Sequence, residues 1–454
     1  MPKPPRPACA LLAALLSLPS WTAAGQPGPA RGLARIDHIV VIYLENHSFD
    51  NLYGLFPGAA GIAQAPPQAT RQTDLQGRIY DTLPPVVNTE HKPPVHDGRF
   101  PADLPNQPFD IGRYVPPDQK TGDLTHRFYQ HQQQIDGGRM DRFAAVSDAG
   151  GLAMGYYDGT KLPLWQYARR YTLADHFFQA AFGGSFLNHM WLACACTPRH
   201  PDPPPDMLAR LDDQGGLVKD GTFSPDGYAV NTVFPAQGPH PAAIDPRKLL
   251  PPLVQPTLGD RLSDKRISWA WYAGGWNDAV AGRADPGFQF HHQPYAYFQR
   301  YAGGTRDRAE HLKDGADFLA ALEHDRLPAV AFYKPIGSLN EHPGYADLLS
   351  GERHIADILG KIERGKFWPR TLVIVTYDEY GGFWDHVPPP MLDRWGPGSR
   401  IPALIVSPFA KRGHVDSTVY NTTSILKLIE TRFGLAPLGE RDAKAQSLSK
   451  ALGW

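Results

Sequence analysis

The pattern of apolar and polar positions along the chain predicts strands that alternate with helices. Five short, almost continuously apolar runs are typical of strands covered on both faces in a parallel sheet. They are residues 39–44, 267–271, 329–333, 371–377 and 403–407. Helical signals occur at residues 162–170, 188–196, 315–324, 345–364 and 423–433. This alternation indicates an α/β fold with a doubly wound, mostly parallel sheet.

Two long segments interrupt the pattern. Residues from about 58 to 120 are rich in Pro, Gln and Asn, and residues 197–256 contain the run PDPPPD and several Gly-Pro turns. We expect both to be irregular insertions that lie over the edge of the sheet, where substrate contacts often reside. We therefore predict a single large domain at residues 25–454 of this 454-residue chain.

The first 24 residues have the pattern of a signal peptide. Lys3 and Arg6 precede an apolar run at residues 8–18, and small residues at 22–24 offer a cleavage point. The run is shorter than the roughly 20 apolar residues that span a bilayer, and no later segment qualifies. We expect a periplasmic or secreted protein without stable membrane insertion. A net charge of -1 and a pI near 7.0 give no reason to expect binding to nucleic acid.

The cysteines do not predict a disulfide framework. Cys9 falls in the predicted signal peptide, whereas Cys194 and Cys196 are one residue apart in a helical context. A bond between such close neighbours is expected to be strained. We therefore predict two small buried thiols at these positions.

Polar residues directly follow two of the predicted strands. The run at 371–377 ends at Asp378 and Glu379, and two glycines follow, which let the backbone approach a ligand closely. The run at 39–44 ends at Glu45 and Asn46. Ligands bind at the carboxyl edge of open α/β sheets, and neighbouring carboxylates are costly unless a cation neutralises them. These four residues therefore predict a site for one divalent metal ion.

A glycine pair introduces Ser185 at the start of a predicted helix. This serine is either a simple helix cap or a hydroxyl placed where the helix N-terminus favours an anion. A metal ion beside the hydroxyl would make it a nucleophile. Asn188 and His189, one turn later, are candidate contacts for the same anion.

Histidines occur in three separate loops with unusual surroundings. His126 follows Asp and Thr, His291 and His292 lie between aromatic residues, and His342 follows the strand at 329–333. Imidazoles from three loops at one rim suggest phosphate contacts and protonation of a leaving group, because histidine donates protons near neutral pH.

Several ordered motifs together resemble one known family. The segments ENHSFDNLYG, GGSFLNH, HHQPYAYF, NEHPGYAD and YDEYGGFWDHVPPP resemble the bacterial acid phosphatase and phospholipase C phosphoesterases, from about residue 36 to about residue 433. The resemblance implies a fold like that of alkaline phosphatase and the hydrolysis of phosphoesters.

The resemblance also implies roles for individual residues. Ser185 would be the metal-bound nucleophile that takes the phosphoryl group. The other implied metal ligands are Glu45, Asn46, Asp378 and Glu379. The implied phosphate-site histidines are His126, His292 and His342, while the choice between His291 and His292 stays open. The candidate substrate contacts are Asn188, His189, His291, Asp385 and His386.

The nucleophile segment favours one branch of this family. Ser185 with Asn188-His189 looks more like the acid phosphatases than the phospholipases, which usually have threonine and Pro-Asn-Arg there. We predict hydrolysis of small phosphomonoesters through a phosphoserine. A phospholipase C acting on phosphatidylcholine-type lipids stays an alternative, as does a non-catalytic surface-binding protein. The candidate choline-binding aromatic residues are Trp271, Tyr295, Tyr297, Phe298 and Trp384.

Overall fold

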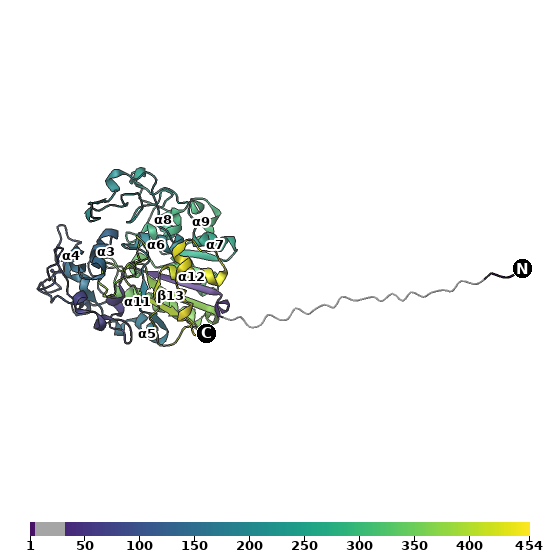
Figure 1. The fold of residues 1–454 in the computed structure, drawn as a ribbon, viewed down its shortest axis with the longest axis horizontal. Coiled ribbons are helices and arrows are strands. Elements are labelled where there is room, and N and C mark those ends of the chain that lie inside the picture. Colours follow the sequence, from purple (N-terminus) through teal and green to yellow (C-terminus); the bar gives the residue numbers. More distant parts are fainter. Residues whose placement is uncertain (5–31) are drawn as a thin grey trace.

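A computed structural model describes residues 1–4 and 32–454 as an α/β structure around a central eight-stranded sheet (Figure 1). The strands are ordered β11 (Leu312–Asp314), β10 (Trp269–Ala273), β12 (Val330–Lys334), β1 (His38–Leu44), β13 (Thr371–Tyr377), β14 (Ala403–Val406), β6 (Thr172–Ala174) and β15 (His414–Asp416). Every residue of β13 is buried, as expected for a strand covered on both faces. The predicted α/β class is confirmed.

The sheet is mostly parallel, with one exception. β1 pairs in parallel with β12 and β13, and β10 pairs in parallel with β11 and β12. β14 is antiparallel to both β13 and β6. The expectation that residues 403–407 form another parallel strand is therefore wrong, because a continuous apolar run reports burial on two faces and carries no information about direction.

Helices cover the sheet in two groups. α5 packs against α11, and α6 contacts α7 and α12. In Figure 1, α6 and α12 lie above β13 and α5 lies below it. The helices are α1 (Phe49–Tyr53), α2 (Pro67–Thr70), α3 (Phe128–Ile135), α4 (Phe143–Val146), α5 (Pro163–Arg170), α6 (Ser185–Cys194), α7 (Leu258–Asp264), α8 (Trp276–Val280), α9 (Arg306–His311), α10 (Gly315–Glu323), α11 (Leu348–Arg364), α12 (Thr423–Phe433) and α13 (Glu440–Lys444).

Both predicted insertions contain only short elements. Residues 58–120 include α2 and the strands β2 (Val87–Asn88), β3 (Val95–His96) and β4 (Phe109–Asp110), of which β4 pairs with β5 (Gly155–Tyr156). Residues 197–256 include β8 (Arg210–Leu211) and β9 (Leu217–Lys219). A further small pair joins β7 (Phe177–Phe178) to β16 (Tyr420–Asn421).

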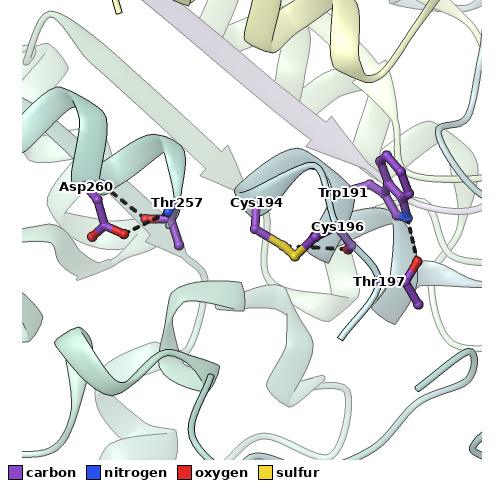
Figure 2. The surroundings of a disulfide bond; sticks show 6 residues. All are labelled: Trp191, Cys194, Cys196, Thr197, Thr257 and Asp260. Carbon is purple, nitrogen blue, oxygen red and sulfur yellow. Dashed lines mark hydrogen bonds between the residues drawn. A yellow bond between two sulfur atoms is a disulfide. The ribbon is translucent and has the colours of Figure 1, made fainter. Parts of the chain in front are cut away.

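A disulfide bond joins Cys194 to Cys196, which contradicts the prediction of two free thiols. Figure 2 shows the bond between Cys194, the last residue of α6, and Cys196. Ala195 adopts the left-handed conformation, with φ 49° and ψ 35°, and so reverses the chain at the end of the helix. The Cα atoms then lie 5.2 Å apart, within the usual span of a disulfide. In a continuous helix the side chains of residues i and i+2 point to opposite sides, so the two sulfur atoms could not meet. The prediction assumed such a helix.

The predicted signal peptide falls mostly on residues 5–31, which lie outside the described residues. Within the part of the chain that is described, none of the helices combines the length and the apolar character needed to cross a membrane.

Candidate active site

Three neighbouring strands deliver charged side chains to one edge of the sheet. Leu44 at the end of β1 pairs in register with Tyr377 at the end of β13, so Glu45 and Asp378 follow side by side. On the other side of β1, the strand β12 ends at Lys334. All three charged residues are at most 1% exposed. The predicted clustering of acids at this edge is therefore present, together with a lysine that we did not predict.

Ser185 opens α6 directly against this cluster. Its Oγ lies 3.1 Å from Glu45 Oε2, 3.2 Å from Asn46 Oδ1 and 3.3 Å from Glu379 Oε1. Gly183 has φ 82°, and a Cβ there would lie 2.6 Å from the Phe128 nitrogen. Glycine is thus required for the turn that brings the serine to the acids.

Backbone amides fix the two acids that follow β13. Asp378 Oδ1 accepts hydrogen bonds from the amides of Asn46, at 3.2 Å, and Glu379, at 2.8 Å. Glu379 Oε2 accepts from the Gly381 amide at 2.7 Å. A Cβ at Gly381 would lie 2.0 Å from the Asn46 carbonyl oxygen, so this close approach of the two loops needs glycine.

Burial sets the electrostatics of the three carboxylates. Desolvation, followed by repulsion from Glu45, raises the pKa of Asp378 well above its usual range. Desolvation also raises the pKa of Glu379. For Glu45, desolvation is outweighed by Lys334 and His292, which hold its pKa well below the ordinary value. A cation among these oxygens would relieve the repulsion.

The donor set around Ser185 fits a divalent metal ion. It combines three carboxylates, one amide oxygen and one hydroxyl, which are ligands for hard and borderline cations. Asp378 Oδ2 is buried and has no hydrogen-bond partner among the described residues. The residues that would hold the ion are Glu45, Asn46, Ser185, Asp378 and Glu379.

Two of the predicted histidines lie beside Asn46. The Nδ2 atom of Asn46 is 2.9 Å from His342 Nε2 and 3.4 Å from His126 Nε2. The other nitrogen of each ring contacts the backbone. His342 Nδ1 lies 2.5 Å from the Pro343 carbonyl oxygen, and His126 Nδ1 lies 2.5 Å from the Leu124 carbonyl oxygen. Both imidazoles therefore present Nε2 toward the cluster.

The structure brings both His291 and His292 to the site, in different positions. His292 Nε2 lies 2.7 Å from Glu45 Oε1. His291 lines the cavity in front of Ser185. Burial is the main cause that lowers the pKa of His292, to about 4, and it also lowers the pKa of His291.

Asn188 and His189 lie behind Ser185, away from the cavity. Asn188 Oδ1 accepts from the Ala181 amide at 2.9 Å, and its Nδ2 donates to the Ala181 carbonyl at 3.2 Å. His189 is fully buried, and its Nδ1 donates to the Ser185 carbonyl at 2.8 Å. Neither residue lines the cavity, so this placement does not support the predicted substrate contacts. Asn188 instead braces the glycine turn.

Asp385 and His386 belong to a separate buried ion network. Arg400 Nε donates to Asp385 Oδ1 at 2.8 Å, and Arg400 Nη2 lies 3.1 Å from Asp50 Oδ1. His386 Nδ1 lies 2.6 Å from Asp50 Oδ2. The structure does not bring these two predicted contacts to Ser185, because the arginine and Asp50 take up their polar atoms.

A cavity of about 300 Å³ opens in front of Ser185. Residues that the sequence did not single out supply much of its wall. They are Asp123, Arg127, Phe186, Leu187, Asn231, Thr232, Gln289 and Tyr345. Asn231 and Thr232 come from the insertion at 197–256, where substrate contacts were expected. Among the site residues that we did not predict, Lys334 is the one that the sequence could have indicated. It is a charged residue at the end of an apolar strand, as Asp378 is a charged residue directly after one.

The family model described as "Phosphoesterase family" matches residues 36–436. The chain belongs to the phosphoesterase family. Phospholipase C B of Mycobacterium tuberculosis is 25% identical over 456 residues, which cover 90% of this chain and 75% of that protein. The non-hemolytic phospholipase C of Pseudomonas aeruginosa is 23% identical, over 92% of this chain and 57% of its own length.

Solved structures that match part of the chain include a protein of the alkaline phosphatase superfamily from Vibrio parahaemolyticus. It is 11% identical, covers 73% of this chain and 74% of its own, and has a TM-score of 0.33. The match to the family model confirms the predicted resemblance to the phosphoesterase family, and phosphoester hydrolysis is the activity shared by the two named relatives.

Proposed function

We propose that this phosphoesterase is a metal-dependent phosphatase that hydrolyses small phosphomonoesters through a phosphoserine at Ser185. The observation that carries the proposal is the position of the Ser185 hydroxyl. It lies within 3.3 Å of oxygens from Glu45, Asn46 and Glu379, at the N-terminus of a ten-residue helix and at the wall of a cavity. An alcohol so placed is a suitable nucleophile.

A divalent ion held by the five-residue donor set would supply positive charge that favours the ionised serine and offsets the phosphate. The chain's own residues supply the rest. Ser185 Oγ attacks phosphorus in line with the departing alkoxide, and the N–H groups of the first turn of α6 hold phosphate oxygens. Water then cleaves the phosphoserine and restores the serine.

His126 and His342 are the proposed proton donors to the leaving group. Both rings turn Nε2 toward the cluster and are fixed through Nδ1 by backbone carbonyls. Both also line the cavity. When such a ring is protonated, Nε2 changes from an acceptor of the Asn46 amide to a donor and can pass its proton to the oxygen of the departing alcohol.

The cavity wall favours a small polar substrate over a lipid. The aromatic residues proposed for choline binding are core residues, and none of them lines the cavity. Instead Asp123, Arg127, Asn231, Thr232 and Gln289 give the wall hydrogen-bonding and charged groups. The names of the two relatives above favour the second candidate, a phospholipase C.

Export of the protein is part of the proposal. The support is the Cys194–Cys196 disulfide, because such bonds persist in oxidising compartments such as the periplasm. The sequence pattern at residues 1–24 agrees with this placement.

Hydrolysis of p-nitrophenyl phosphate and of phosphatidylcholine vesicles, compared at equal protein with added Mg²⁺, Mn²⁺, Ca²⁺ or Zn²⁺, separates the two candidates. We expect release from the monoester at least about tenfold faster. Ser185→Ala should abolish turnover and the phosphoserine seen by intact mass after acid quenching. Ser350→Ala, which also changes a serine in the first turn of a helix, is the matched control. Near-normal turnover by Ser185→Ala would eliminate the proposed nucleophile, and faster lipid hydrolysis would assign the phospholipase activity.

A further inference from the structure

Lys334 holds a buried positive charge directly behind the proposed metal site. It is the last residue of β12 and is 0% exposed. Its ammonium contacts Glu45 Oε1, donates to the Leu44 carbonyl at 3.1 Å and lies 4.0 Å from Asp378 Oδ2. Burying a lysine is costly unless it is paired with acids, as it is here.

With this lysine and one divalent ion, the formal charges of the cluster sum to zero. Glu45, Asp378 and Glu379 together carry three negative charges when ionised. While the Ser185 hydroxyl is protonated, one divalent ion leaves a single negative charge, which the ammonium of Lys334 balances. Without the lysine, a single ion would leave the buried cluster with an uncompensated charge.

The space around the ammonium also has ligands suited to a second cation. Glu45, His189 and His292 are all buried, and each offers a ligand atom within 4.8 Å of the others. His189 Nε2 has no hydrogen-bond partner in the described part of the chain. Two imidazole nitrogens and a carboxylate are a ligand set for Zn²⁺. The Lys334 ammonium contacts one member of this set, Glu45.

We propose that Lys334 takes the place of a second metal ion, so that the centre holds one divalent ion instead of two. Lys334 and His292 both hold Glu45 Oε1, which leaves Oε2 directed at Ser185. The lysine thus orients the shared carboxylate and blocks the second position. This inference rests on the metal centre of the proposed function.

The test is the number of Zn²⁺ ions bound per chain. Protein stripped with EDTA is equilibrated with a small excess of Zn²⁺, freed of unbound metal and measured by elemental analysis. Wild type should bind one equivalent. Lys334→Ala, which removes the charge and opens the space, should bind two. Lys334→Met removes the charge but fills the space, and should bind one.

The outcomes separate this inference from the proposed function. Two equivalents in wild type, or one in a folded Lys334→Ala, would overturn the role of Lys334 while leaving the metal centre in place. No bound metal in wild type would overturn both. Lys361→Ala, which changes a partly exposed lysine of α11, is the control and should match wild type.

Thermal unfolding gives a second readout that does not depend on a bound metal. In EDTA, Lys334→Met should melt several degrees below wild type, because the buried carboxylates of Glu45 and Asp378 lose the positive charge of Lys334 beside them. Saturating Zn²⁺ should narrow this difference. An unchanged melting temperature in EDTA would refute the charge-balancing role.

Discussion

The folded protein should lose stability as the pH rises from 4.5 to about 8, and replacing Glu352 by glutamine should remove this loss. Glu352 lies on α11 and is 1% exposed. Its Oε2 accepts a hydrogen bond at 2.5 Å from the Leu164 amide, in the first turn of α5. Burial raises the pKa of its carboxyl to about 8 from an ordinary value of 4.5. The neighbouring Glu341 also has a raised pKa, because of burial and then repulsion from Glu352.

The sign follows from proton linkage. With a raised pKa, the folded state binds more protons than the unfolded state between pH 4.5 and about 8. The free energy of unfolding therefore falls as pH rises through this window, and the contribution of the protonated carboxyl is complete only below pH 4.5. At about 1.36 kcal/mol per pH unit the full window corresponds to about 5 kcal/mol, as an upper limit.

Glutamine keeps the shape and an acceptor for the Leu164 amide, yet it stays neutral at every pH. We expect Glu352→Gln to resemble wild type near pH 4.5 and to become more stable than wild type toward pH 8, by roughly 2–4 kcal/mol. Urea unfolding of EDTA-treated protein at several pH values between 4.5 and 8 measures the difference.

The control is Glu323→Gln, which changes an exposed glutamate at the end of α10. Its free energy of unfolding should change with pH as that of wild type does. If the free energy of unfolding changed with pH equally in Glu352→Gln and in wild type between pH 4.5 and about 8, the raised pKa of Glu352 would be refuted. A variant that is less stable than wild type at pH 8 would show that the ionised carboxylate is the stabilising form.

Two further predictions concern the architecture around the site. Arg400→Met should cost about 3–5 kcal/mol of stability by urea unfolding, because it leaves the buried carboxylates of Asp50 and Asp385 without their arginine, and a cost below about 1 kcal/mol would contradict a paired network. Gly183→Ala should lower kcat for p-nitrophenyl phosphate by at least about tenfold, because the residue has φ 82° and its Cβ would meet the Phe128 backbone and displace the turn that positions the serine. Gly303→Ala, where a Cβ meets nothing within 4 Å, is the matched control, and equal kcat in both variants would show that the turn tolerates a side chain.

Much of the site was predictable because its signals are local. An apolar strand that stops at Glu45-Asn46 or at Asp378-Glu379 can be recognised from a dozen residues. The rule that parallel strands end at a common edge then places the two pairs together. The glycines before Ser185 and after Glu379 were readable for the same reason, since close backbone approach requires residues without a Cβ.

Other predictions were wrong because the sequence pattern indicates which residues are buried but does not indicate which residues they contact. Asp385 follows Asp378 by seven positions, yet its carboxylate turns to Arg400 instead of Ser185. Cys194 and Cys196 were expected to be free thiols, and the left-handed conformation of Ala195 joined them. Both outcomes depend on contacts or on backbone torsions that no local periodicity encodes.

The sequence by itself determined which segments are buried strands, which acids follow them and which family the chain resembles, because these depend on residue order and on the periods of strands and helices. Only the tertiary structure decided that Lys334 contacts Glu45, 289 positions away, and that β14 runs against its neighbours. The physical reason is that strand neighbours and strand direction are set by the packing free energy of the whole sheet. An apolar run is equally well buried in several positions, and the complete core selects one of them.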